Sequence, residues 1–243
     1  MKDFTKRCIS WIEAYFKDAN AKRAVIGVSG GKDSTVCTAL LARALGPENV
    51  YGVLLPDGAQ RDIEDARRVV ELLKVNPIEI NIKSITDAFK EDFPKASEQA
   101  LTNLPPRVRM TMLYFVAQSL GEALVCNTSN LDEAFVGYST IWGDSVGDLA
   151  PLGMLHVSEV VDIGLDLGLP EYLVKKAPDD GLTGKSDEER LGFTYKDVEN
   201  VMEGQPPVNK ELEKKILSMH SKNSFKSRAI NLPTFLKADN STN

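Results

Sequence analysis

Short apolar runs that alternate with amphipathic segments constrain the fold of this chain more than any other feature of its sequence. Runs at residues 24–28, 50–55 and 77–82 each precede a segment in which apolar side chains recur at helical spacing. A fourth run, 123–126, follows a helical pattern over 107–120. Strands that alternate with helices in this way indicate βαβ units and a parallel sheet, so the sequence predicts an α/β fold.

Helical patterns dominate the rest of the chain, and we expect a single domain over residues 1–243. An amphipathic helix opens the chain, helices are predicted over 157–167 and 170–176, and the C-terminal third is helical and charged. Residues 101–106 are expected to be a non-helical interruption ahead of the helix at 107–120. A chain of 243 residues is long enough for one α/β domain with a sizeable core, whereas two full domains would be cramped.

The charge and the cysteines restrict the partners and the compartment. A net charge of −6 and a pI near 5.1 argue against a nucleic acid as the main partner, because phosphate binding usually leaves a basic footprint. The first residues lack the apolar core of a secretory signal, and no apolar run approaches the roughly 20 residues that a membrane helix needs. Cys8, Cys37 and Cys126 are widely spaced in apolar settings and are expected to be reduced, buried thiols. We therefore expect a cytoplasmic protein that acts on neither nucleic acids nor membranes.

The most informative short segment is Ser29–Ser34 (SGGKDS), which joins the first apolar run to a helix. It is not a Walker A loop, because Asp33 rather than Ser or Thr follows Lys32, and its glycines do not have the spacing of a dinucleotide fingerprint. The glycines let backbone N–H groups approach an anion closely, at a helix N-terminus that favours negative charge. Asp33 would repel a polyphosphate unless Mg²⁺ lay between them, since Mg²⁺ is held by one or two carboxylates plus phosphate oxygens. The alternative is that Asp33 merely caps the helix.

A second polar segment is expected beside this loop. In doubly wound sheets, ligands bind beyond the carboxyl ends of the strands, at the point where the strand order reverses. Ser29–Ser34 follows the first predicted strand and Asn127–Asn130 follows the fourth. We therefore expect both segments to contribute to one site.

The loop resembles the pyrophosphate loop of the N-type ATP pyrophosphatases, which cleave ATP to AMP and pyrophosphate while activating a carbonyl or a carboxylate. Further motifs resemble those of ammonia-dependent NAD⁺ synthetase, and the similarity extends from about residue 4 to residue 225. These motifs are Arg107-x-Arg109-Met110, Asn127-Thr128-x-x-x-x-Glu133, Gly137-Tyr138-Ser139-Thr140, Gly143-Asp144, Asp148-x-x-Pro151, Pro178-x-x-Gly181-Leu182, Ser186-Asp187-Glu188 and Leu191-Gly192-Phe193-Thr194-Tyr195.

The resemblance implies an adenine nucleotide alpha-hydrolase-like fold, with a doubly wound parallel sheet of five strands and helices on both faces. It implies that ATP adenylates the carboxylate of deamido-NAD⁺ and that ammonia then displaces AMP. It also implies one NAD synthetase-like domain without a glutaminase domain. The same resemblance implies a homodimer, with the N-terminal helix and the helix at 107–120 as candidate interface elements. Residues 178–189 are expected to form a lid that orders when substrates bind.

Site residues follow from the same resemblance. The ATP phosphates are assigned to Gly27, Val28, Ser29, Gly30, Gly31, Lys32, Asp33 and Ser34, with Thr128 as a further ATP contact. Mg²⁺ is assigned to Asp33 and Glu133, catalysis to Asp33, Lys32 and Ser34, and deamido-NAD⁺ to Arg107, Arg109, Asp148 and His220. Ordinary alternatives stay open: a solvated carboxylate for Glu133, a turn former for Thr128, inert arginines and an Asx turn at Asp148. Trp142 and Tyr138 either stack on a ring or pack in the core, and His156 is expected to pack.

Three positions depart from the usual family pattern. Ile141 stands where a basic residue is common, Val157 where a lysine is common, and Asp179 where Thr or Ser is common. Lys32 and Lys185 are candidate replacements for the missing contacts. Two rival functions stay open: a tRNA-modifying enzyme of the same superfamily, and a nucleotide-binding protein without turnover.

Overall fold

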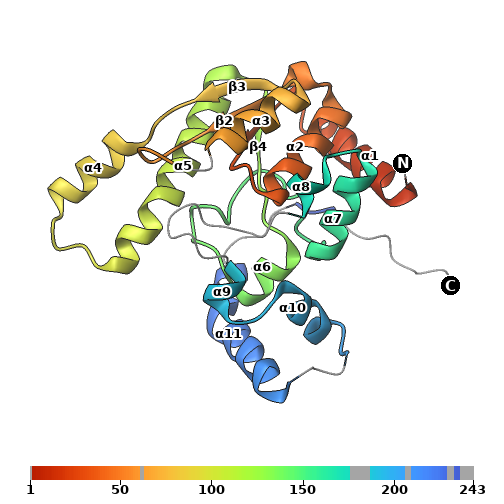
Figure 1. Ribbon diagram of the computed structural model, residues 1–243. Helices are drawn as coiled ribbons and strands as arrows, with labels where there is room; N and C mark the ends of the chain where they lie inside the picture. Colours follow the sequence, from red (N-terminus) through yellow and green to blue (C-terminus); the bar gives the residue numbers. More distant parts are fainter. Residues whose placement is uncertain (1, 61–62, 176–186, 206–208, 229–232, 236–243) are drawn as a thin grey trace.

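The computed structural model describes residues 2–60, 63–175, 187–205, 209–228 and 233–235. Its centre is a parallel sheet in the order β3-β2-β1-β4, built from β1 (Arg23–Gly27), β2 (Val50–Leu54), β3 (Asn76–Glu79) and β4 (Ala123–Cys126) (Figure 1). In the central strand, Ala24 pairs with Val50 on one side and with Leu124 on the other. The interior of β1 is fully buried, as expected for a parallel strand with helices on both faces. The predicted βαβ organisation is confirmed.

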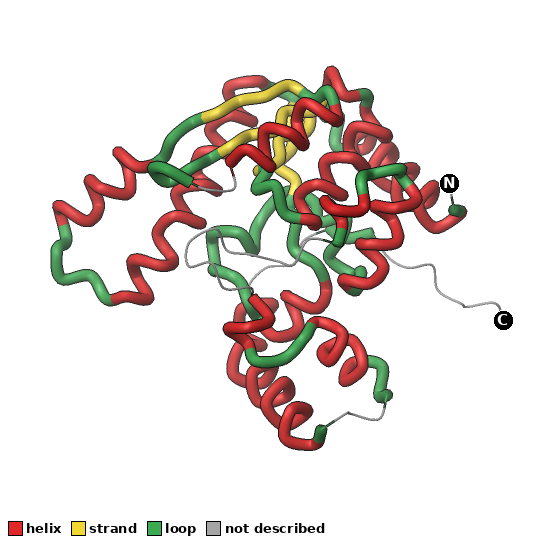
Figure 2. The backbone as a smooth tube through the Cα atoms, in the orientation of Figure 1, coloured by secondary structure: helices red, strands yellow, loops and turns green. Residues whose placement is uncertain are grey.

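Helices account for most of the remaining described residues (Figure 2). They are α1 (Asp3–Asp18), α2 (Lys32–Leu45), α3 (Ile63–Leu73), α4 (Lys83–Asp92), α5 (Glu98–Leu120), α6 (Leu131–Val136), α7 (Val157–Asp166), α8 (Glu171–Val174), α9 (Asp187–Leu191), α10 (Tyr195–Met202) and α11 (Lys210–Arg228), with a 3₁₀ turn at Pro47–Asn49. The helices predicted at the N-terminus, at 157–167 and in the C-terminal third are confirmed. Among the described residues, no helix is both long enough and apolar enough to cross a membrane.

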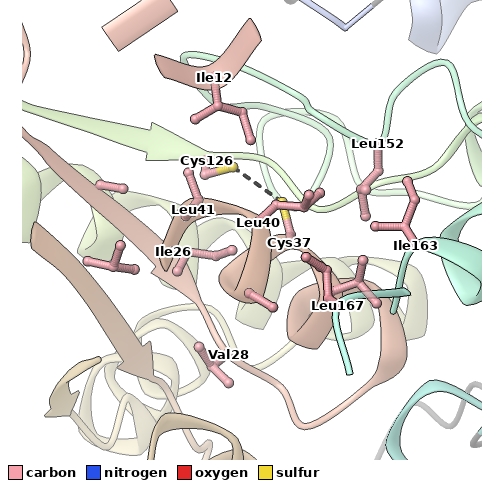
Figure 3. Close-up of a cluster of buried hydrophobic side chains, with 14 of the residues drawn as sticks. Ile12, Ile26, Val28, Cys37, Leu40, Leu41, Cys126, Leu152, Ile163 and Leu167 are labelled. Carbon is pink, nitrogen blue, oxygen red and sulfur yellow. Dashed lines mark hydrogen bonds between the residues drawn. The ribbon is translucent and has the colours of Figure 1, made fainter. Parts of the chain in front are cut away.

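One face of the sheet carries the largest core, with helix α2 at its centre. Helix α2 contacts β1 and β2 on the sheet side and α1 and α7 on the outer side, and the buried side chains of these elements form one cluster (Figure 3). Within that cluster the sulfur atoms of Cys37 and Cys126 lie 3.4 Å apart, joining α2 to β4. All three cysteines are free and buried, as predicted.

The opposite face is covered by α5, which is longer than the sequence predicts. Its apolar side packs on Val25, Val53 and Val125. The expected interruption at 101–106 is wrong, because α5 continues through Pro105 and Pro106. The helix starts early because the Ser97 side chain accepts a hydrogen bond from the N–H of Ala100, a normal N-cap. Each proline lacks the backbone N–H that would donate to the carbonyl four residues earlier. Those carbonyls belong to residues 101 and 102, which are exposed, so water can take the place of the missing donor.

Helices α6, α9, α10 and α11 form a separate lobe below the sheet in Figure 1. The lobe has its own buried cluster, which consists of Val136, Leu191, Phe193, Tyr195, Val198 and Ile216. Helix α6 follows β4 closely and contacts both α10 and α11, so it connects the lobe to the sheet.

The expected number of strands is wrong. The described residues form four paired strands rather than five. Beyond β4 the chain makes only two isolated bridges, Cys126 with Leu149 and Ala150 with Thr234. Leu149 and Ala150 thus pair with different partners, so no ladder of consecutive pairs forms there. The proposed lid at 178–189 lies outside the described residues except for its last three, which begin α9.

Candidate active site

The loop after β1 and the loop after β4 meet where the strand order reverses, as the sequence predicts. Inside the first loop, the hydroxyls of Ser29 and Ser34 lie 3.1 Å apart and the N–H of Gly31 donates to the Ser29 hydroxyl. Gly30 has φ +80°, and a Cβ there would lie 2.7 Å from the backbone nitrogen of Ala66. The position therefore requires glycine, which lets the loop pass close to α3.

Asp33 does not cap helix α2. The N-cap is Gly31, and no side chain caps that end of the helix. One carboxylate oxygen of Asp33 accepts from the Lys32 ammonium at 2.9 Å and the other from the Asn130 amide at 3.2 Å. The helix-cap alternative is therefore wrong, and Asp33 is held in place by a neighbour and by the loop after β4.

Lys32 lies inside the site, with only 4% of its surface exposed. Burial alone lowers the pKa of Lys32, but the carboxylates of Asp33 and Glu133 outweigh burial and raise the pKa above its usual value. The side chain is therefore a buried ammonium ion. Lys32 therefore places a positive charge within the predicted phosphate loop itself.

Asn130 connects the two predicted metal ligands. Its amide nitrogen donates to Asp33, and its amide oxygen accepts from the N–H of Glu133 at 3.0 Å. The Asn130 N–H donates in turn to the Glu133 carboxylate, which completes a capping box at the start of α6. Burial and the nearby charge of Asp33 raise the pKa of Glu133 to about 8. Two carboxylates that repel each other in a buried site are a natural position for a cation.

Two cavities meet at the loop serines, and the larger of them includes the acidic pair. A cavity of about 240 Å³, lined largely by apolar residues from β1, β2 and α5, shares Ser29, Ser34 and Thr128 with a larger one of about 570 Å³. The larger cavity contains Lys32, Asp33 and Glu133 and extends towards the lobe. It shares further residues with a third hollow at the rim, near Arg107 and Ile141.

Not every predicted site residue reaches these cavities. Arg109 lines the first two, and its Nε donates to the carbonyl of Leu55. Arg107 lies at the rim and donates to the carbonyl of Ile141. The Asp148 carboxylate instead accepts from the Tyr114 hydroxyl and from the N–H of Val125, away from the cavity linings. The structure therefore does not bring Asp148 together with the phosphate loop.

His220 does not itself line these cavities, although Met219 and Asn223 on the same helix line the large one. The His220 ring stacks on Phe135 with the ring centroids 4.0 Å apart, and its Nδ1 bonds to the Phe135 carbonyl. His156 packs as expected: it is buried, and its Nδ1 lies 2.7 Å from the Asp132 carboxylate. Tyr138 lines the large cavity, whereas Trp142 is 62% exposed.

Sequence and structure comparisons agree on the family. The chain matches the NAD synthase family over residues 4–230. The chain belongs to this family. The NH₃-dependent NAD⁺ synthetase of Carboxydothermus hydrogenoformans is 36% identical over 237 residues, which cover 94% of this chain and 96% of the relative.

Solved structures of the family share the fold. The structure of NMN synthetase from Francisella tularensis has 29% identity and a TM-score of 0.88, covering 96% of this chain and 98% of that one. The NH₃-dependent NAD synthetase from Campylobacter jejuni, in complex with the nitrate ion, has 30% identity and a TM-score of 0.75, covering 98% of this chain and all of that one. The predicted resemblance to NAD⁺ synthetase and the α/β fold class are therefore confirmed.

Two residues of this NAD synthase family member lie at the site although the resemblance gives neither of them a role. The Lys226 ammonium donates to the carbonyls of Gly137 and Ser139, and its side chain lines the large cavity. The Asp144 carboxylate accepts from the N–H of Thr140. Both residues fasten the loop after α6. Asp144 stands in one of the family motifs, which was an available signal, whereas no motif marked Lys226.

The positions that depart from the family pattern lie in three different settings. Ile141 is at the rim and Val157 packs against the lobe cluster. Asp179 and Lys185 lie outside the described residues. Among the candidate replacements, Lys32 is the one that the structure places at the acidic pair.

The ligand-free protein is expected to lose stability between about pH 5 and pH 8, and Glu133→Gln should remove most of that loss. The pKa of Glu133 is about 8 in the folded chain against 4.5 ordinarily, so the folded state binds an extra proton between these values. Stability from a raised pKa is fully present below the unfolded value and is lost as pH rises through the folded value. One such proton contributes a slope of at most about 1.4 kcal/mol per pH unit. Urea unfolding across this range measures it, and identical slopes for both proteins would contradict the assignment.

Proposed function

We propose that this protein amidates deamido-NAD⁺ with ammonia, consuming ATP and releasing AMP and pyrophosphate. One observation carries the proposal: the loop serines and the acidic pair Asp33 and Glu133 face the same cavity system at the switch point of the sheet. The NH₃-dependent relatives that match nearly the whole chain support the same reaction. ATP binding, the substrate identities and the roles of the individual residues are part of the proposal.

The reaction needs two displacements and no covalent enzyme intermediate. A carboxylate oxygen of the substrate attacks the α-phosphorus of ATP, and pyrophosphate leaves. Ammonia then attacks the acyl carbon of the adenylate, and AMP leaves. The mainly apolar cavity suits the adenine ring, and the loop Gly27–Ser34 suits the phosphates. Catalysis then depends on positioning and on charge stabilisation by donors such as Lys32.

Mg²⁺ is proposed to bind with ATP at Asp33 and Glu133. The described residues contain no group of three His, Cys, Asp or Glu side chains placed to hold a metal by themselves. Two carboxylates therefore leave several positions for phosphate oxygens and water, which is the coordination that Mg²⁺ favours. The bound ion would neutralise charge on the departing pyrophosphate.

A second candidate substrate is the corresponding mononucleotide acid, nicotinate mononucleotide. The observation that favours it is the TM-score of 0.88 with NMN synthetase, against 0.75 with the NAD synthetase of Campylobacter jejuni. The two reactions share the same carboxylate and the same adenylation chemistry. They differ only in whether the substrate carries a second nucleotide.

Pyrophosphate release with each acid substrate tests the proposal. The purified protein is incubated with ATP, Mg²⁺ and ammonium, plus deamido-NAD⁺ or nicotinate mononucleotide or neither. Release that requires deamido-NAD⁺ supports the first candidate, and faster release with the mononucleotide supports the second. A tRNA-modifying enzyme or a non-catalytic binding protein would respond to neither acid. Glutamine that replaces ammonium at an equal rate would contradict ammonia as the donor.

We infer that the protein acts in the cytoplasm, as one domain over residues 1–243, and as a homodimer. Helix α5 is a candidate dimer interface, because its Phe115 is 66% exposed and a partner subunit would cover that apolar side chain. In contrast, Phe4 and Trp11 of α1 pack against Phe235 of the same chain. Light scattering at micromolar concentration should show a dimer, and Phe115→Asp should weaken it. A fully active monomer would contradict the inference.

A further inference from the structure

The hydroxyl of Tyr195 is buried without a hydrogen-bond partner. Within the described part of the chain, it is the one buried side-chain oxygen or nitrogen in this condition. The residue begins α10, and only 2% of its surface is exposed. Buried polar groups are nearly always paired, so an unpaired one requires an explanation.

The surroundings of this hydroxyl make the missing bond more unusual. Burial raises the pKa of Tyr195, and the carboxylates of Glu133, Asp187 and Asp33 raise it further. The phenol therefore stays protonated and has a proton to donate. Carboxylates are strong acceptors, yet none of the described residues places an acceptor within bonding geometry of the Tyr195 hydroxyl.

Tyr195 neighbours a residue that lines the large cavity. The Lys32 ammonium stands 5.7 Å from the centre of the Tyr195 ring. Lys32, Asp33, Glu133 and Asp187 all line that cavity. The same ammonium is bound to Asp33, so Lys32 neighbours both the acidic pair and the tyrosine ring.

Packing of the ring does not explain why this position carries a tyrosine rather than a phenylalanine. The Tyr195 ring belongs to the lobe cluster, where its neighbours include Val136, Val198 and Ile216. A phenylalanine would fill the same space without a polar atom that loses its water. The hydroxyl therefore lowers the stability of the ligand-free protein.

We propose that the Tyr195 hydroxyl is a donor to a phosphate oxygen of bound ATP, and that it becomes accessible when Lys32 leaves Asp33. The inference rests on the proposed function, because ATP supplies the acceptor. Asp33 and Glu133 would hold the divalent cation that accompanies ATP, and Asp33 would then no longer be available to pair with the Lys32 ammonium. Lys32 and Tyr195, which lie side by side, then face the same phosphate group.

Tyr195→Phe tests the proposal, with Tyr114→Phe as its matched control. The Tyr114 hydroxyl is paired with Asp148 and lies away from the cavities. Melting temperatures are measured with and without ATP and Mg²⁺, together with kcat/KM for ATP in the pyrophosphate assay. Tyr195→Phe should melt no lower than the wild type without ligand, lose at least half of the ATP-induced rise, and lower kcat/KM about ten- to a hundredfold. Tyr114→Phe should melt lower and keep its response to ATP.

Two results would overturn the proposal. One is an unchanged ATP-induced rise together with kcat/KM within twofold of the wild type. The other is a lower melting temperature for ligand-free Tyr195→Phe, which would mean that the hydroxyl already has a structural partner. If wild-type protein releases no pyrophosphate with either acid substrate, the proposed function fails. A loss of the ATP-induced rise in Tyr195→Phe would in that case still support the hydroxyl as an ATP contact.

Discussion

Lys32→Ala is expected to lower the kcat for pyrophosphate release by about 10²- to 10³-fold, the usual effect of removing one donor that stabilises developing charge. Lys32 is buried beside the predicted metal ligands, and its ammonium is 2.9 Å from Asp33. Val157 stands where the family commonly has a lysine, and it packs in the lobe. Lys32 belongs to the loop itself and would act on charge that develops in the transition state, so the loss should fall mainly on kcat.

The control for this substitution is Lys22→Ala. Lys22 is an exposed lysine paired with Glu122, remote from the site, and should leave kcat unchanged. Lys32→Met retains the apolar stem and separates lost charge from lost packing. If Lys32→Ala retains native kcat and native KM for ATP, the role in charge stabilisation is wrong.

Asn130→Asp is expected to weaken the binding of Mn²⁺, used as a spectroscopic probe for Mg²⁺ in the presence of ATP, by about 10- to 100-fold. Asp caps a helix as well as Asn does, so α6 should keep its start. The change removes the amide donor to Asp33 and places a third carboxylate beside Asp33 and Glu133. The two ligands should therefore lose their fixed orientation, although no ligand has been removed.

Asn130→Ala separates the two functions of this side chain. Alanine removes the bond to Asp33 and the cap together, so this variant should melt lower than Asn130→Asp. Electron paramagnetic resonance measures bound Mn²⁺, and KM for the metal should rise more than kcat falls. Native Mn²⁺ affinity in Asn130→Asp would contradict a positioning role for Asn130.

Local patterns in the sequence were sufficient for the strands and for the loop. The four apolar runs and the segment Ser29–Ser34 each depend on neighbouring residues, and the structure places them as predicted. The start of α5 was missed because two prolines suggested a break, although Ser97 carried the cap signal. The fifth strand was expected from the family, and the pairing beyond β4 is too short to form it.

The site was harder to predict because its walls come from distant parts of the chain. The sequence placed Lys32 in the loop but did not determine where its ammonium points, since the direction of one side chain depends on the folded loop. Asn130, Lys226 and Tyr195 acquire their positions only when the lobe packs beneath the sheet. Conversely, the family resemblance assigns Asp148 and His220 to deamido-NAD⁺, and the structure gives both of them partners that do not line the cavities.

The acidic pair lies across two separately packed bodies. Asp33 begins the helix at the centre of the sheet core, whereas Glu133 belongs to α6, whose Val136 is buried in the lobe cluster. The lobe has its own buried cluster, so we expect it to open as a separate cooperative unit. If Asp33 and Glu133 held a cation together, its binding free energy would add to the cost of separating the two bodies. Hydrogen exchange of the backbone amides in α10 and α11 would then report whether the site is occupied. Those amides exchange when the lobe separates from the sheet, so a bound cation would slow their exchange.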